Sequence, residues 1–78
     1  MNKQRRAKIE NIRKLIGECS TQLQEVIEEE QEYLDNMPES LQESERAEAS
    51  QEAIDNLESA LEQTQEVIES LVFGSIEL

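Results

Sequence analysis

The chain has 78 residues and a net charge of −12, with no histidine, no tryptophan and 36% hydrophobic residues. Without histidine, the Ser-His-Asp and Cys-His catalytic groups and the histidine-containing zinc and di-iron sites are excluded. No segment has the length and apolarity of a transmembrane helix or a secretory signal, and the single Cys19 has no intrachain disulfide partner. We therefore expect a cytoplasmic, non-enzymatic protein without cofactor or metal that does not enter the membrane.

A first helix is expected at about residues 3–36, a stretch without proline and with one glycine, Gly17. At ~100° per residue, its apolar side chains fill an arc of about 120°, which is wider than the seam of a two-stranded coiled coil. Gly17 projects away from this arc, and we interpret it as a tolerated soft point that costs roughly 0.8–1 kcal/mol. A functional hinge is the less favoured alternative. Cys19 lies on the arc and is interpreted as a small core residue.

The corner of the expected hairpin contains the pair Met37-Pro38. Because proline disfavours helical geometry at the preceding residue, the first helix is expected to end here. Two starts compete for the second helix: Ser40 with Glu43 has the spacing of a capping box, and Ser44 is a simple N-cap. We favour Ser44.

The second helix is expected at about residues 44–72, after a turn at about 37–43 and before a short C-terminal tail at 73–78. Its apolar and small side chains span about 160°, which is again too wide for one partner helix. The pattern predicts an all-α, coiled-coil-like antiparallel two-helix hairpin that forms a single domain over residues 1–78. Since one partner helix covers neither arc, we expect two hairpins to complete a four-helix bundle as a homodimer, with higher homo-oligomers left open.

An ion pair between Glu30 and Arg46 is expected across the hairpin. Folding the chain near residue 40 pairs positions whose numbers sum to about 80, because both helices rise equally per residue. Glu30 interrupts the first apolar arc and lies opposite Ser50, and Arg46 projects into the second arc about one turn from Ser50. A carboxylate in such a place needs a partner, solvent or a proton. The alternative is that both side chains extend to solvent at the edge of the arc.

Charge is distributed unevenly along the chain. Residues 1–14 hold six basic residues and one acid, a net charge of +5, whereas residues 15–78 hold one arginine and 18 acids, a net charge of −17. The basic segment is expected to lie beside acids of the second helix, with about 0.2–1 kcal/mol from each exposed pair. Binding to an anionic membrane or to phosphate groups is less favoured, because the segment lacks aromatic residues.

Eight acidic residues share about 140° of the outer face of the second helix: Glu45, Glu48, Glu52, Asp55, Glu58, Glu62, Glu66 and Glu69. They place one charge every ~5 Å, against one per ~3.4 Å in a DNA strand. We interpret this candidate acidic face as a solvated surface that favours a basic protein partner and discourages nucleic acid, with mimicry of nucleic acid as the alternative. The tail offers a candidate apolar contact through Phe73, Ile76 and Leu78.

The corner also carries a resemblance to known proteins. The segments EEQEYLDNMPESLQ at 29–42, SER at 44–46 and AIDNLE at 53–58 resemble short acidic helical-hairpin proteins of phages, prophages and bacteria. The resemblance covers about residues 28–71 and implies a recurring hairpin unit in a phage-related setting, without an activity or a catalytic residue. We therefore expect an acidic protein-interaction module, a phage-encoded modulator of a host or phage protein. The alternatives are a nucleic-acid-mimicking inhibitor of a DNA- or RNA-binding protein and a purely structural oligomerisation element.

Overall fold

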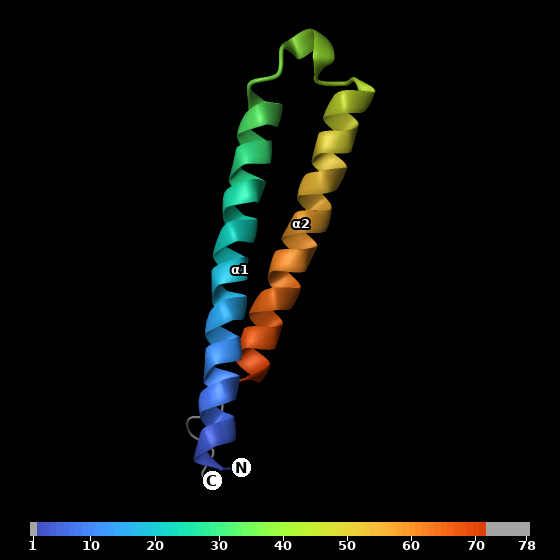
Figure 1. The fold of residues 1–78 in the computed structure, drawn as a ribbon. Helices are drawn as coiled ribbons and strands as arrows, with labels where there is room; N and C mark the ends of the chain where they lie inside the picture. The colour runs from blue at the N-terminus through green and yellow to red at the C-terminus, as the bar shows by residue number, and fades with distance from the viewer. Residues whose placement is uncertain (1, 72–78) are drawn as a thin grey trace.

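The computed structural model describes residues 2–71, and these residues form a helical hairpin without strands. Helix α1 spans Lys3–Asp35, the 3-10 helix η1 spans Glu39–Leu41 and helix α2 spans Glu45–Ser70. The two long helices run antiparallel and pack against each other, and η1 joins them at the corner (Figure 1). The prediction of an all-α antiparallel hairpin is confirmed, whereas a bundle of two hairpins stays a prediction.

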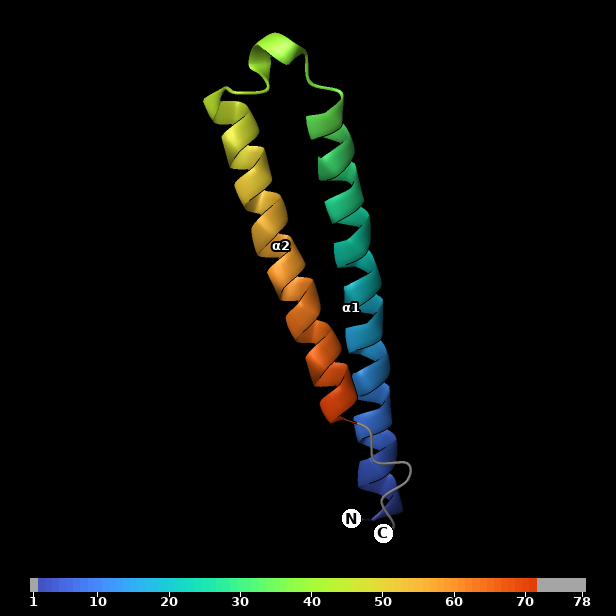
Figure 2. The same cartoon turned by 180° about the vertical axis from the view of Figure 1, so that it is seen from behind.

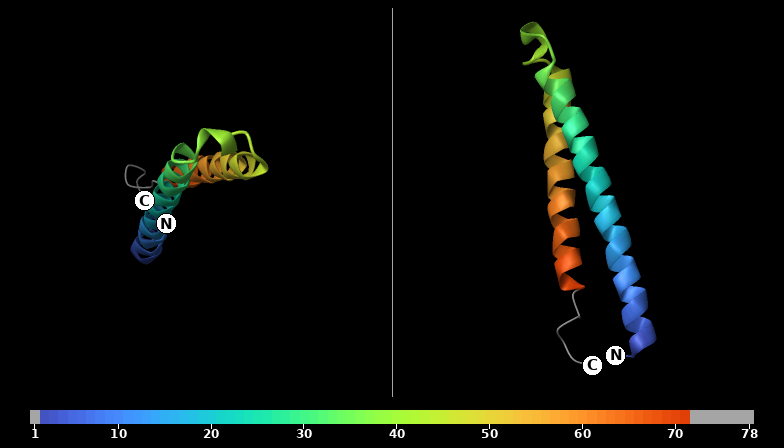
Figure 3. Two further views of the ribbon diagram at one scale, coloured as in Figure 1. Left: turned by 90° about the horizontal axis from the view of Figure 1, so that it is seen from above. Right: turned by 90° about the vertical axis from the view of Figure 1, so that its left-hand side faces the viewer.

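The hairpin is long and narrow, with extents of 60 × 15 × 14 Å and a radius of gyration of 18.0 Å. A compact domain of this length has a radius of gyration of about 11–12 Å. Seen from opposite sides, the helices stand apart at the corner and approach each other toward the open end, where α1 begins and α2 ends (Figures 1 and 2). In the view turned by 90° about the vertical axis, the helices overlap near the corner and stand apart at the open end (Figure 3, right). The helices therefore cross at an angle.

Both long helices begin at a side-chain cap. At α1, the Asn2 side chain accepts a hydrogen bond from the Arg5 amide at 2.8 Å. At α2, the Ser44 hydroxyl accepts a hydrogen bond from the Ala47 amide at 3.3 Å. Each cap satisfies an amide that has no partner within its helix. Of the two starts predicted for the second helix, Ser44 is the one used, and Ser40 lies within η1.

The first helix ends directly before Met37-Pro38. Asn36 is the C-cap of α1, and its amide donates a hydrogen bond to the Glu32 carbonyl at 3.0 Å. The Met37 side chain is buried, and the Met37 carbonyl accepts a hydrogen bond from the Gln42 side chain at 3.1 Å. The buried Met37 side chain and the two hydrogen bonds from Asn36 and Gln42 thus hold the corner against the end of α1.

The core between the helices is small and lies toward the corner. The buried side chains of the described part of the chain are Ile27, Met37, Ala47, Ser50 and Ile54. Toward the open end, the inward residues are only half-buried, Ile9 and Ile16 among them. A core of this size leaves the hairpin short of buried apolar surface, since small domains without a further staple are marginally stable.

Replacing Gly17 with alanine is expected to stabilise α1. A Cβ atom added at this position would have nothing within 4 Å, so the substitution causes no clash. Alanine is favoured over glycine inside a helix, and we expect Gly17→Ala to raise the free energy of unfolding by about 0.5–1 kcal/mol. Urea denaturation followed by far-ultraviolet circular dichroism measures the change. A decrease in stability would instead support the hinge interpretation.

Candidate functional site

One face of the hairpin carries apolar side chains that neither helix covers, and we name it the apolar face. Its large exposed members keep 42–52% of their surface in solvent and comprise Ile12, Leu15, Val26, Tyr33, Leu41 and Val67. Cys19, which is predicted from the sequence to be a core residue, is instead exposed, and it completes the face together with the half-buried Leu57 and Ala60. The apolar face thus draws on both long helices and on the corner.

Shallow hollows between α1 and α2 show that the two helices contribute to the same face. Near the middle of the hairpin, Val26 of α1 and Leu57 of α2 line one hollow. Closer to the open end, Ile16 of α1 and Val67 of α2 line another. Ile12 lies two heptads before Val26 and therefore projects to the same side of α1. The uncovered apolar residues form one surface along the hairpin.

Glu30 lies beside this face in the corner half of the hairpin. Its carboxylate accepts a hydrogen bond from the Ser50 hydroxyl at 2.7 Å, and Ser50 is only 4% exposed. A hydrogen bond to an ionised group is stronger than one between neutral groups. The contact joins two positions whose numbers sum to 80, so the predicted register of the hairpin is confirmed.

The predicted ion pair between Glu30 and Arg46 is not formed, and this prediction is corrected. Within residues 2–71, the single side-chain ion pair joins Arg13 and Glu10 at 3.2 Å. Arg46 is exposed and borders the same hollow as Glu30 and Ser50. The Ser50 hydroxyl reaches the carboxylate from directly opposite, whereas the longer arginine side chain would lose both hydration and conformational freedom. The serine, and not the arginine, holds Glu30 in place.

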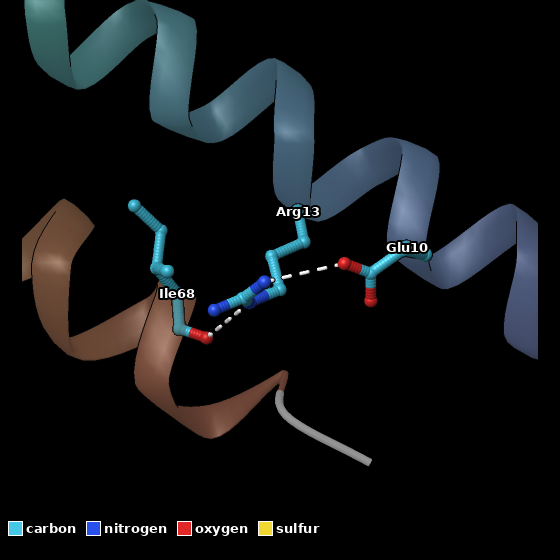
Figure 4. A network of polar contacts seen from close by, with 3 residues as sticks. All are labelled: Glu10, Arg13 and Ile68. Atoms are coloured by element: carbon cyan, nitrogen blue, oxygen red, sulfur yellow. Dashed lines mark hydrogen bonds and ion pairs between the residues drawn. The ribbon is translucent and has the colours of Figure 1, made fainter. Parts of the chain in front are cut away.

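At the open end, Arg13 connects the two helices (Figure 4). Its Nε donates a hydrogen bond to the Ile68 carbonyl at 3.3 Å, and its Nη1 donates one to the Glu10 carboxylate at 3.2 Å. Ile68 lies in the last turn of α2, at the negative end of the helix dipole, and its carbonyl also accepts a hydrogen bond from the Leu71 amide at 3.2 Å. Sequence reasoning missed this contact, although the register places residue 13 opposite the last turn of the second helix.

Arg13→Ala is expected to lower the free energy of unfolding by about 1 kcal/mol, because it removes a hydrogen bond and a positive charge from the C-terminus of α2. Arg46→Ala is the matched control, and we expect a change within about 0.5 kcal/mol because Arg46 is exposed. Urea denaturation of both variants at equal protein concentration measures the difference. A larger loss for Arg46→Ala would restore the ion pair with Glu30.

The basic segment, residues 1–14, does not form the expected ion pairs with α2 within the described part of the chain. Lys3, Arg5 and Lys8 are exposed there. Lys3 and Arg5 lie in the first turn of α1, where the positive end of the helix dipole disfavours basic side chains, and Lys8 lies in the second turn. Ion pairs between this segment and the described part of α2 therefore do not set the antiparallel register.

The acidic face is fully solvated in the structure. All eight of its residues are exposed, and they follow one another along the length of α2. In residues 2–71, no three acidic or cysteine side chains converge in a way that would hold a metal ion. Neighbouring acids four residues apart repel each other, so this face costs helix stability. The predicted tail contact through Phe73, Ile76 and Leu78 lies outside the described residues.

The sequence was compared with protein-family models, with curated proteins and with solved structures. None of the three comparisons finds a match. In residues 2–71, neither long helix contains a stretch with the length and apolarity that a membrane crossing takes.

Proposed function

We propose that this chain is a non-enzymatic interaction module that binds a helical surface through its apolar face and keeps its acidic face in solvent. The observation that carries the proposal is the apolar face itself, which extends along both long helices. A contiguous exposed apolar surface is typical of an interaction site. A bound helical surface would also supply the apolar burial that the small core of the hairpin lacks.

The acidic face would select among partners. Its charge repels nucleic acid and acidic proteins and speeds the encounter with basic ones. Together with the resemblance of the corner to phage and bacterial hairpins, this supports a modulator of a host or phage protein. The proposal includes a cytoplasmic setting, because a reducing compartment keeps the exposed Cys19 as a free thiol.

A second candidate function is mimicry of nucleic acid. The observation that favours it is the exposure of eight acids along one helix, which gives a charge about every 5 Å. A DNA-binding protein would meet this line of charges in place of a phosphate backbone. In that case binding would depend on the acidic face and on salt, and not on the apolar face.

Capture of binding proteins from a cell lysate separates these functions when it uses three tagged forms of the chain. They are the unmodified protein, Val26→Asp on the apolar face, and a neutralised acidic face with Glu52→Gln, Asp55→Asn and Glu58→Gln. A partner that stays bound at high salt and is lost with Val26→Asp supports the interaction module. A partner that is lost at high salt, lost with the neutralised face and displaced by duplex DNA supports mimicry. Recovery of the bait alone would indicate a structural oligomerisation element.

A further inference from the structure

The apolar face is bordered by charges of opposite sign at its two ends. The α1 members of the apolar face belong to two rows of residues at seven-residue intervals, and the rows continue beyond the face: Arg5, Ile12, Cys19, Val26 and Tyr33 in one row, and Lys8, Leu15, Gln22 and Glu29 in the other. Residues at this spacing lie along one stripe of a helix and are typical of a coiled-coil seam. Along these two rows the basic residues lie at the open end, the apolar residues in the middle and Glu29 toward the corner, where Glu30 and Arg46 border the neighbouring hollow.

The net charge of the hairpin as a whole also differs between the corner half and the open half. The corner half, residues 20–58, holds 13 acids and one arginine, a net charge of −12. The open half, residues 2–19 and 59–71, holds six basic residues and five acids, a net charge of +1. Two hairpins stacked with their corners together would place both strongly acidic halves side by side. Stacking in the opposite sense separates them, so electrostatic repulsion favours the antiparallel arrangement.

We propose that a second copy of the chain covers the apolar face, packed so that the corner of each hairpin lies beside the open end of the other. This inference rests on one part of the proposed function, that the apolar face is an interface, and names a second copy in place of another protein as its occupant. The apolar residues of α1, from Ile12 to Tyr33, are centred near Gln22, which shares a hollow with Leu57. A twofold axis at this point pairs α1 positions whose numbers sum to about 44.

This arrangement accounts for features that the single hairpin leaves uncompensated. Arg5 and Lys8 lie beside the corner of the other copy, where Glu39 and Glu43 supply negative charge. Those acids would also offset the basic residues at the positive end of the α1 dipole. A surface with opposite charges at its ends is self-complementary under a twofold rotation, as an isologous interface requires. The product is a four-helix bundle with an apolar interior.

Self-association is measured first, by sedimentation equilibrium over a range of protein concentrations. The unmodified chain is expected to form a dimer, and Val26→Asp is expected to weaken it by roughly tenfold or more, because a carboxylate would enter the interface unpaired. Gln24→Asp adds the same charge at an exposed position on another side of α1, and we expect dimerisation within about twofold of the unmodified chain. Circular dichroism confirms that both variants remain helical.

The orientation is measured by the distance between spin labels at single cysteines in a Cys19→Ser background. A label at Glu39→Cys lies about 17 residues from the proposed axis, so the two labels are expected to be about 50 Å apart. With corners together, the same labels would lie within about 30 Å of each other. A label at Glu18→Cys lies close to the axis and is expected to give a short distance. A long distance at position 39 with a short one at position 18 supports the antiparallel dimer.

Three results would overturn the inference. None of them decides the proposed function, which the capture experiment from a cell lysate tests separately. A chain that stays monomeric shows that the occupant is another protein, and the lysate experiment with Val26→Asp then still decides whether the apolar face is an interface. A dimer with a short distance at position 39 has its corners together. A dimer unaffected by Val26→Asp uses a different surface.

Discussion

Ile54→Ala is expected to lower the free energy of unfolding by about 2–4 kcal/mol, the largest loss that we expect from a single truncation within residues 2–71. Ile54 is 1% exposed and lies in the small core between α1 and α2. Removing its outer methylene and methyl groups costs their transfer free energy and leaves a cavity that two rigid helices close only in part. A small domain has only a few kcal/mol of stability, so most of it is lost.

Urea denaturation at one fixed protein concentration measures this loss, because self-association would make stability depend on concentration. The control is Asn56→Ala, an exposed position on the same helix, for which we expect a change within about 0.5 kcal/mol. If Ile54→Ala loses no more than this control, the contact between the helices is not the main source of stability, and the described packing of α1 on α2 is wrong.

Ser50→Ala is expected to lower the free energy of unfolding by about 1.5 kcal/mol. The substitution removes the hydrogen bond of 2.7 Å to Glu30 and leaves that half-buried carboxylate without its donor. Hydrogen bonds to charged groups contribute more than neutral ones, which outweighs the small gain from the helix propensity of alanine. Thermal and urea denaturation measure the effect.

A double-mutant cycle with Glu30→Ala isolates the contact between the two side chains. The coupling free energy between Ser50 and Glu30 is expected to be about 1 kcal/mol or more, because each single change removes the same hydrogen bond. Ser59→Ala is the matched control, since Ser59 is exposed and its hydroxyl accepts a hydrogen bond from the Gln63 side chain of the same helix. A coupling near zero would show that Glu30 is held by solvent, as the alternative interpretation of the sequence proposes.

The uncovered apolar face explains why the arcs of both helices are wider than a hairpin needs. In α1, Ile27 is buried against α2, whereas Val26, its neighbour in sequence, keeps 47% of its surface in solvent. One part of each arc therefore makes the hairpin, and the adjacent part is free for a further helical surface. Sequence periodicity indicated the width of the arcs and hence the need for more burial, but not which part each partner covers.

The helices, the corner and the register were predictable because their signals are local or follow from helix geometry. The two apolar patterns, the pair Met37-Pro38 and the cap at Ser44 indicate where helices form, stop and start. Equal rise along both helices then sets Ser50 opposite Glu30. These features depend on residues close in sequence or on a fixed repeat, and neither requires knowledge of how the helices rotate against each other.

Only the tertiary structure decided which polar groups meet. Arg46 and Ser50 are one helical turn apart, and a modest rotation or winding of α2 determines which of them reaches Glu30. The same geometry brings Arg13 to the Ile68 carbonyl and leaves the basic segment without ion pairs to the described part of α2. Side-chain partners depend on reach and on interhelical rotation, which periodicity resolves too coarsely. The chain by itself therefore determined the hairpin, and its packing decided the contacts and the face left for a partner.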